Sequence, residues 1–282
     1  MRHLSNTMKR RLILTAIALS SAGALLIPAN DAVSVYTVAE ASQNEAQTQQ
    51  TAKPSDTSAH AYSDNADTPE DTAMDMYCLQ KAAKEGDVKA QFMLSKYYYE
   101  GTNVEQDYTQ AAYWLQKVAE QEIAPAQLML AGWYHNGIGV EKNYKQEVYW
   151  LQKTAEQYDA IAQNNLGVCY SKGYGIKQDY DRAVYWWQKS AEQGEPRALY
   201  HLGDCYIDGI GVEKDEAKTV DYYTRAAEQG DADAQAALAN CYANGIGVEK
   251  DHTKAVYWYT KASEQGRIDA QEALRQLDKD SN

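Results

Sequence analysis

A single pattern recurs every 36 residues through most of this chain. Alanine holds the first place of each period, at Ala90, Ala126, Ala162, Ala198, Ala234 and Ala270. Tyrosine holds the ninth place of five successive periods, at Tyr98, Tyr134, Tyr170, Tyr206 and Tyr242. Self-similarity at a fixed period of this length indicates stacked supersecondary units that bury their apolar faces against their neighbours.

Residues 162–197 show how one period is expected to fold. Ala162 and Leu166 are four residues apart, which places them on one face of a helix. A glycine pair interrupts this helix, Asp179 offers a side-chain cap for a second helix, and Gly194 suits its left-handed end. The sequence therefore predicts an all-α fold of helix-turn-helix repeats.

The repeated string reads Ala-x-x-x-Leu-Gly-x-x-Tyr-x-x-Gly-x-Gly-Val, then Asp-x-x-x-Ala-x-x-Trp-x-x-Lys-Ala-Ala-Glu-Gln-Gly. It resembles the Sel-one-like repeat (SLR) family, relatives of the tetratricopeptide repeats, over about residues 71–277. The sequence departs from that pattern at Asn103, Glu122 and Tyr158, which replace glycines, and at Thr219, which replaces alanine. The resemblance implies a right-handed α/α superhelix, or solenoid, that presents a concave surface to a protein or peptide.

The amino terminus has a different character from the repeats. Basic residues precede an apolar run that ends near Pro28, which is typical of a secretory signal peptide, and Ala39 to Ala41 offers a cleavage site. The following polar segment has none of the large aliphatic residues that could offset its ordering entropy. We therefore expect a signal peptide at 1–41, a disordered linker at 42–70 and a solenoid at 71–282, comprising a half repeat at 71–89, five repeats at 90–269 and a capping helix at 270–282.

The charge balance limits the partners that this chain can bind. The net charge is −13 and the isoelectric point is about 4.8. Nucleic-acid binding depends on clustered Lys and Arg, so we expect no nucleic-acid partner. We also expect no membrane insertion of the mature chain, and a monomer.

No arrangement of residues predicts catalysis, a metal site or a cofactor. The histidines are scattered without metal-ligand spacing and are interpreted as solvated surface residues: His3, His60, His135, His201 and His252. The cysteines are interpreted as buried apolar thiols, with a disulfide or a metal site as the alternative: Cys78, Cys169, Cys205 and Cys241. Some cysteine-rich members of the family are described as weak β-lactamases, but this chain has no S-x-x-K or K-T-G motif.

The tryptophans divide into two groups. Four recur at one place of the repeat, which predicts a core between repeats: Trp114, Trp150, Trp186 and Trp258. The other two, Trp133 and Trp187, do not share that place and are predicted to be exposed.

Places four, seven and eleven of the first helix vary most between repeats. Residues three or four apart lie on one helix face. If first helices line the concave side, these places form a groove for a partner. The predicted partner-binding residues are Met93, Lys96, Met129, Asn136, Asn165, Lys172, His201, Asp204, Asp208, Asn240 and Asn244.

The leading hypothesis is an exported, non-catalytic scaffold, periplasmic or secreted in a bacterial envelope, that binds a protein or peptide. A second hypothesis, held by family analogy, is a weak β-lactamase or an enzyme acting on the cell wall. A third is a secreted effector or adhesin that engages host proteins.

Overall fold

The computed structural model describes residues 69–280, and within that range the chain forms helices and turns but no strand. The first helices of the repeats are α4 (Val88–Glu100), α6 (Ala124–Asn136), α8 (Ala160–Lys172), α10 (Pro196–Asp208), α12 (Ala232–Asn244) and α14 (Ile268–Asp280). The second helices are α3 (Pro69–Lys84), α5 (Tyr108–Ala119), α7 (Tyr144–Ala155), α9 (Tyr180–Glu192), α11 (Glu216–Glu228) and α13 (His252–Glu264). The predicted all-α helical-repeat fold is confirmed.

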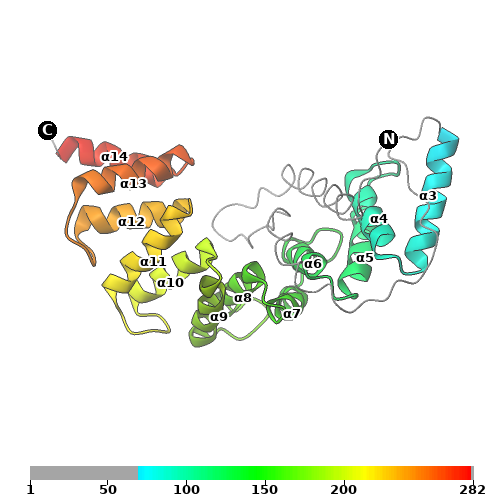
Figure 1. Cartoon of the computed structure of the whole chain (residues 1–282), viewed down its shortest axis with the longest axis horizontal. Helices are drawn as coiled ribbons and strands as arrows, with labels where there is room; N and C mark the ends of the chain where they lie inside the picture. The colour runs from blue at the N-terminus through cyan, green and yellow to red at the C-terminus, as the bar shows by residue number, and fades with distance from the viewer. Residues whose placement is uncertain (1–68, 281–282) are drawn as a thin grey trace, which may run out of the picture. The chain divides into compact units, whose positions relative to one another are not determined.

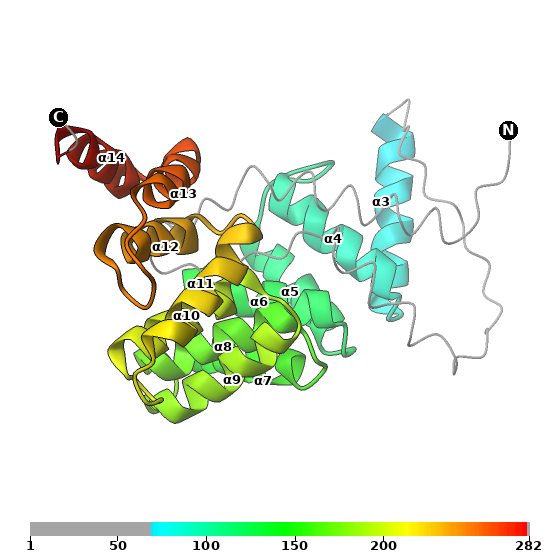
Figure 2. The same cartoon turned by 60° about the vertical axis from the view of Figure 1, so that its left-hand side comes forward.

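The first helices α4, α8, α10 and α12 each pack against the second helix that follows, as α10 does with α11 (Figure 1 and Figure 2). The described residues fall in two compact units that divide between Lys153 and Thr154. The predicted signal peptide and residues 42–68 of the predicted linker lie outside the described range. Helix α3 begins at Pro69, so the last two residues of the predicted linker are helical.

The second helices begin where the sequence predicts. A side-chain oxygen accepts hydrogen bonds from main-chain N–H groups of the first turn at five positions, which are Asp107, Asn143, Asp179, Asp215 and Asp251. Such a cap satisfies N–H groups that have no partner within the helix and stabilises it by about 1 kcal/mol.

The turns require unusual backbone angles at the three places where glycine is replaced. Asn103, Glu122 and Tyr158 have φ values of 61°, 61° and 64°, in the left-handed region that glycine adopts at least cost. Gly139, the second glycine of its turn, is also required for a close contact, because an added Cβ would collide with the main-chain oxygen of Tyr108. This glycine therefore lets the turn touch the second helix of the preceding repeat.

Residues that are the same in every repeat form much of the core. The leucines at the fifth place of the first helix have no exposed surface: Leu94, Leu130, Leu166, Leu202 and Leu238. Burying one such side chain contributes about 1.5–3 kcal/mol. The repeated leucines therefore supply a large share of the stability of the stack.

The recurring Glu-Gln pair also joins adjacent repeats. The Nε2 of Gln193 donates a hydrogen bond to the Oε1 of Gln163, at 2.9 Å. Gln163 in turn donates to the main-chain oxygen of Ala155 at the end of α7, which also accepts from the N–H of Tyr158. The same glutamine-to-glutamine bond joins Gln265 to Gln235.

The prediction that Trp133 and Trp187 are exposed is wrong, because only 4% and 5% of their surfaces are accessible. Trp187 holds the inward-facing place that Leu115 and Leu151 hold in earlier repeats. Gly167 makes room for its ring, since an added Cβ would lie 2.6 Å from the indole Nε1. Trp114 and Trp150 are buried as predicted, whereas Trp186 and Trp258 are only half-buried.

Two histidines also differ from the solvated surface residues that were predicted. His135 is buried, and its Nδ1 lies 3.0 Å from each carboxylate oxygen of Glu147, which has no exposed surface. Glu147 occupies a place where most other repeats have alanine. The His135–Glu147 pair is therefore a polar contact between α6 and α7 at a place that is apolar in most repeats. His201 is half-buried, and His252 is exposed as predicted. His3 and His60 lie outside the described residues.

Candidate functional site

The predicted partner-binding residues of the amino-terminal unit lie on α4 and α6. Met93 is half-buried against the cluster that contains Leu79 and Trp114, and Met129 is also half-buried. Lys96 lies 3.9 Å from Glu100, an ion pair within α4. Asn136 is exposed and bonds the main chain of its own helix.

In the carboxy-terminal unit four of the predicted residues are exposed, namely Lys172, Asp208, Asn240 and Asn244. The Nδ2 of Asn244 donates to the Oδ1 of Asn240, at 2.6 Å, so these two amides form one polar patch on α12. Asn165 differs from the expectation that all these places face solvent, because only 1% of its surface is accessible. Its Oδ1 accepts a hydrogen bond from Asn164.

Asp204 lies at the centre of a polar and aromatic cluster on α10 and α11. The hydroxyl of Tyr223 donates to its carboxylate at 2.6 Å, and Tyr200 also hydrogen-bonds to it. The rings of Tyr200 and Tyr223 are stacked with centroids 5.8 Å apart. Burial raises the pKa of Asp204 to about 6, and the neighbouring charge of Asp208 adds to this rise.

His201, also on α10, contacts an aromatic ring of α9. Its ring stacks on Trp187 with centroids 4.8 Å apart. Burial, with the positive charges of Arg197 and Lys172, lowers the pKa of His201 to about 3. The imidazole is therefore neutral at physiological pH, and a partner would meet it as an aromatic face with hydrogen-bonding nitrogens.

A ladder of charges fixes the amino-terminal ends of α10, α12 and α14. Arg197 lies 2.7 Å from Asp233 and 3.5 Å from Asp231, which caps α12. Arg267 forms ion pairs with Asp233 and Asp269. Arg197, Asp233 and Asp269 occupy one place of three successive repeats, and Asp231 and Arg267 share another, so the ladder joins equivalent places at which the charge changes sign.

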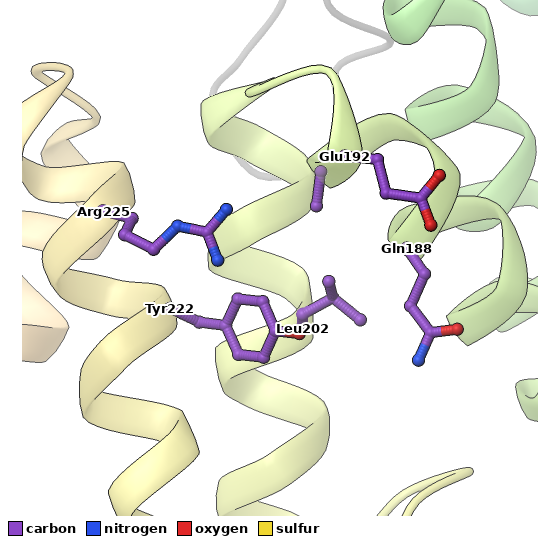
Figure 3. A pocket seen from close by; sticks show the side chains of 6 residues that line it. Gln188, Glu192, Leu202, Tyr222 and Arg225 are labelled. Atoms are coloured by element: carbon purple, nitrogen blue, oxygen red, sulfur yellow. The ribbon is translucent and has the colours of Figure 1, made fainter.

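A pocket lies on the second-helix side of the carboxy-terminal unit, where the sequence predicts no site. It measures about 250 Å³ and is lined by Gln188, Ala191, Glu192, Leu202, Tyr222 and Arg225. Figure 3 shows Tyr222 and Arg225 on one side, Gln188 and Glu192 on the other, and Leu202 between them. The one feature of the sequence that marks this region is Tyr222, which occupies the place where four other second helices have tryptophan.

The cysteines occupy buried or partly buried places. Cys169, Cys205 and Cys241 are buried and Cys78 is half-buried. Burial raises the pKa of the Cys205 thiol to about 12, with the charges of Asp204 and Asp208 adding to the rise. Burial also raises the pKa of Cys241 to about 11. At neutral pH these two thiols are protonated and poorly nucleophilic.

No group of three or more His, Cys, Asp and Glu side chains is arranged to hold a metal ion within residues 69–280. None of the helices described for that range has the length and apolar character needed to cross a membrane.

Paired helices, most of them 12 or 13 residues long, are joined by turns and packed through repeated core places, which defines an α/α repeat protein. The sequence profile of the Sel1 repeat matches residues 67–87, 88–122, 124–159, 160–195, 196–231 and 232–266. This chain belongs to the Sel1 repeat family. Proteins of this family are generally non-catalytic helical-repeat scaffolds, and their repeats typically mediate protein–protein interaction.

Two solved structures resemble this one at 35% sequence identity. The first is c5321, a protective antigen present in uropathogenic Escherichia coli strains, with a TM-score of 0.66 over 72% of this chain. This chain covers 44% of that protein, which is less than half its length. The second is a Sel1 repeat protein from Oxalobacter formigenes, with a TM-score of 0.63 over 74% of this chain and 87% of that one. No curated protein matches this chain.

Proposed function

We propose that this protein is an exported, non-catalytic scaffold that binds a protein or peptide partner along the exposed side of its first helices. The observation that carries the proposal is the contrast in burial within each first helix. In α10 the constant residue Leu202 is fully buried while the variable residue Asp208 is exposed, and in α12 Leu238 and Asn244 differ in the same way. Constant places build the stack, which leaves variable places available to distinguish partners.

The exposed residues of the carboxy-terminal unit suit an extended peptide. The amides of Asn240 and Asn244 can donate to and accept from a peptide main chain. Lys172 and Asp208 add charges of opposite sign on α8 and α10, which favour one direction of binding over the other. His201 adds a neutral aromatic face beside them.

The amino-terminal unit offers a less polar surface. Met93 and Met129 are half-buried on α4 and α6. Thioether side chains are flexible and polarisable, so they can adapt to apolar side chains of different shapes. In this proposal the first helices of that unit accept apolar residues of the partner.

Export to a bacterial periplasm or medium is part of the proposal and rests on the basic and apolar segment that precedes residue 29. We also propose that the chain is a monomer.

Two measurements distinguish this proposal from a β-lactamase or cell-wall enzyme and from a secreted effector. Incubation with a chromogenic β-lactam should give no turnover above buffer, and an enzyme would give turnover. Fractionation of native cells distinguishes an envelope protein from an effector released into the medium.

The proposal is tested with two matched sets of alanine substitutions in the full chain. The first set changes exposed first-helix residues: Lys172→Ala, Asp208→Ala and Asn240→Ala. The control set changes exposed second-helix residues of equal net charge: Lys261→Ala, Glu228→Ala and Thr260→Ala. A partner captured from the native envelope is purified, and its affinity for each variant is measured by calorimetry.

We expect the first set to weaken binding at least ten-fold and the control set to change it less than two-fold. Each set should keep the circular dichroism spectrum of the original chain, because none of the six side chains is buried. Equal binding by the first set and the original chain would contradict the assignment of the partner surface to the first helices.

A further inference from the structure

The pocket that α9, α10 and α11 form lies apart from the first-helix residues of the proposed function. Gln188 and Glu192 extend from α9 on one side of it, and Tyr222 and Arg225 extend from α11 on the other (Figure 3). Its volume of about 250 Å³ lies below the range of about 300–1,000 Å³ typical of sites for drug-sized molecules. A ligand of this pocket is therefore small, such as a single sugar ring or a single amino acid.

The interior of the pocket offers almost no apolar surface to a ligand. Leu202 and Ala191 line it, but their exposed fractions are only 0% and 5%. An aliphatic or aromatic side chain of a partner binds by burying apolar area, and little is available here. The accessible side chains are those of the rim, where Glu192 and Arg225 are 64% and 47% exposed. A ligand must therefore bind mainly through hydrogen bonds to the rim.

The charges around the rim cancel. Glu192 lies 3.1 Å from Lys189, and Arg225 lies 3.6 Å from Asp221. Both ion pairs are exposed, so each contributes little stability, and the carboxylate and the guanidinium can take up other partners at low cost. Two positive and two negative side chains sum to zero, in a chain whose net charge is −13. The charge balance therefore favours an uncharged polar ligand.

The hydrogen-bonding groups of the rim are planar and carry two polar atoms side by side. Gln188 ends in an amide, Glu192 in a carboxylate and Arg225 in a guanidinium. Each of these groups can bond two neighbouring hydroxyls at once, and neighbouring hydroxyls are the defining feature of a sugar ring. Tyr185, which is 51% exposed, shares a face of α9 with Gln188 and Glu192 because it precedes them by three and seven residues. An exposed aromatic ring beside the pocket can pack on the C–H face of a sugar.

We propose that this pocket binds one ring of a neutral sugar, with its hydroxyls bonded to the amide, the carboxylate and the guanidinium of the rim. The adjoining ring of a glycan packs on Tyr185. A hydroxyl both donates and accepts, so one sugar ring can satisfy an acceptor such as Glu192 and a donor such as Arg225 together. The pocket is thus a second binding site, on the opposite helices of the repeat from the proposed partner surface.

The test titrates the full ¹⁵N-labelled chain with the methyl β-glycosides of glucose, galactose, mannose and N-acetylglucosamine. The side-chain amide signal of Gln188 and the Nε–H signal of Arg225 are followed by NMR. We expect saturable shifts with at least one sugar and a Kd on the order of 1 mM, as befits a ligand of this size. Gln116 and Gln152 hold the same place on other second helices, do not line the pocket and should not move.

Charged probes distinguish a neutral sugar from other small polar ligands. Methyl β-glucuronide, an anion, and L-alanine, a zwitterion, should each bind at least ten-fold more weakly than the best neutral sugar. Binding of that sugar should change less than two-fold between about 50 mM and about 500 mM NaCl, because salt screens interactions between charges and not hydrogen bonds to hydroxyls.

Substitutions of exposed residues test the assigned contacts without disturbing the core. Glu192→Ala and Arg225→Ala should each weaken binding at least ten-fold. Arg225→Lys keeps the charge but loses the planar pair of donors, and should weaken it at least five-fold. The matched controls Glu228→Ala and Lys261→Ala, at the same places of other second helices, should change it less than two-fold. Tyr185→Ala should affect only the extra affinity of the corresponding disaccharide.

Four outcomes would overturn the inference: no saturable shift with any of the sugars, tighter binding of a charged probe, equal losses in the control variants, or full affinity in Arg225→Lys. A disaccharide that binds no more tightly than its monosaccharide would contradict the role of Tyr185. None of these outcomes bears on the first-helix surface, because Lys172, Asp208 and Asn240 do not line the pocket.

Discussion

Asp204→Asn is expected to stabilise the folded chain at pH 8 and to have a much smaller effect in acid. Burial raises the pKa of the Asp204 carboxyl from its usual 3.8 to about 6 in the folded state. Between those two values the folded chain binds more protons than the unfolded chain. The free energy of unfolding therefore falls as the pH rises from about 4 to about 6, and it stays lower above that range.

The magnitude follows from the size of the pKa rise. A difference of about two pH units corresponds to about 3 kcal/mol. Asp204 is only half-buried, so screening by solvent reduces this to about 1–2 kcal/mol. Asparagine keeps an oxygen that can accept from the Tyr223 hydroxyl and carries no charge to desolvate. The variant should therefore gain about 1–2 kcal/mol at pH 8, equivalent to about 2–8 °C in melting temperature, and about a third of that at pH 4.5.

The assay is thermal unfolding followed by circular dichroism at pH 8 and pH 4.5. Asp208→Asn is the matched control, because Asp208 lies one turn away and is exposed. It should change the melting temperature by less than half as much. A lower melting temperature for Asp204→Asn at pH 8, or equal gains at the two pH values, would refute the reasoning. The first result would mean that the bonds from Tyr200 and Tyr223 to the carboxylate outweigh its desolvation. The second would mean that the gain does not depend on the ionisation of Asp204.

Three other expectations concern packing, backbone strain and thiol chemistry. Gly167→Ala should destabilise the chain by about 1–3 kcal/mol in urea unfolding, because its Cβ would collide with Trp187. Gly132→Ala is the control, because nothing lies within 4 Å of the added Cβ, and it should raise the free energy of unfolding by up to about 1 kcal/mol. Similar losses of stability in the two variants would contradict the packing argument. Tyr158→Gly should raise stability by about 1 kcal/mol in the same assay, since it relieves a positive φ at an exposed residue; a loss would show that its ring contributes more than the strain costs. Cys205 should react with a thiol reagent at pH 8 only after unfolding, because its pKa is raised to about 12, so rapid reaction in the native chain would exclude a buried thiol.

The local signals of this sequence were sufficient for the fold because each repeat carries them in full. Asp179 and its equivalents cap the second helices as predicted. Asn103 and Tyr158 adopt the positive φ that their alignment with glycine predicts. Such features depend on a few neighbouring residues and on backbone sterics, so they can be recognised without knowledge of the packing.

The side-chain environments could not be predicted as well. Trp187 was expected to be exposed, yet it lies in the core because Gly167, twenty residues earlier, leaves space for its ring. Asn165 shares a variable place with Met93, Met129 and His201, which are half-buried, but it is fully buried beside Asn164. Each outcome depends on which residue faces it from another helix.

The sequence by itself determined the number, length and order of the helices in the repeats, since a period of 36 residues and its caps and glycines act within one repeat. Only the tertiary structure decided that Asp204 meets two tyrosines and that Tyr222, Gln188 and Leu202 line one pocket. Helix formation is governed by neighbours in the chain, whereas the pKa of a carboxyl and the shape of a pocket are governed by groups that packing brings from other helices.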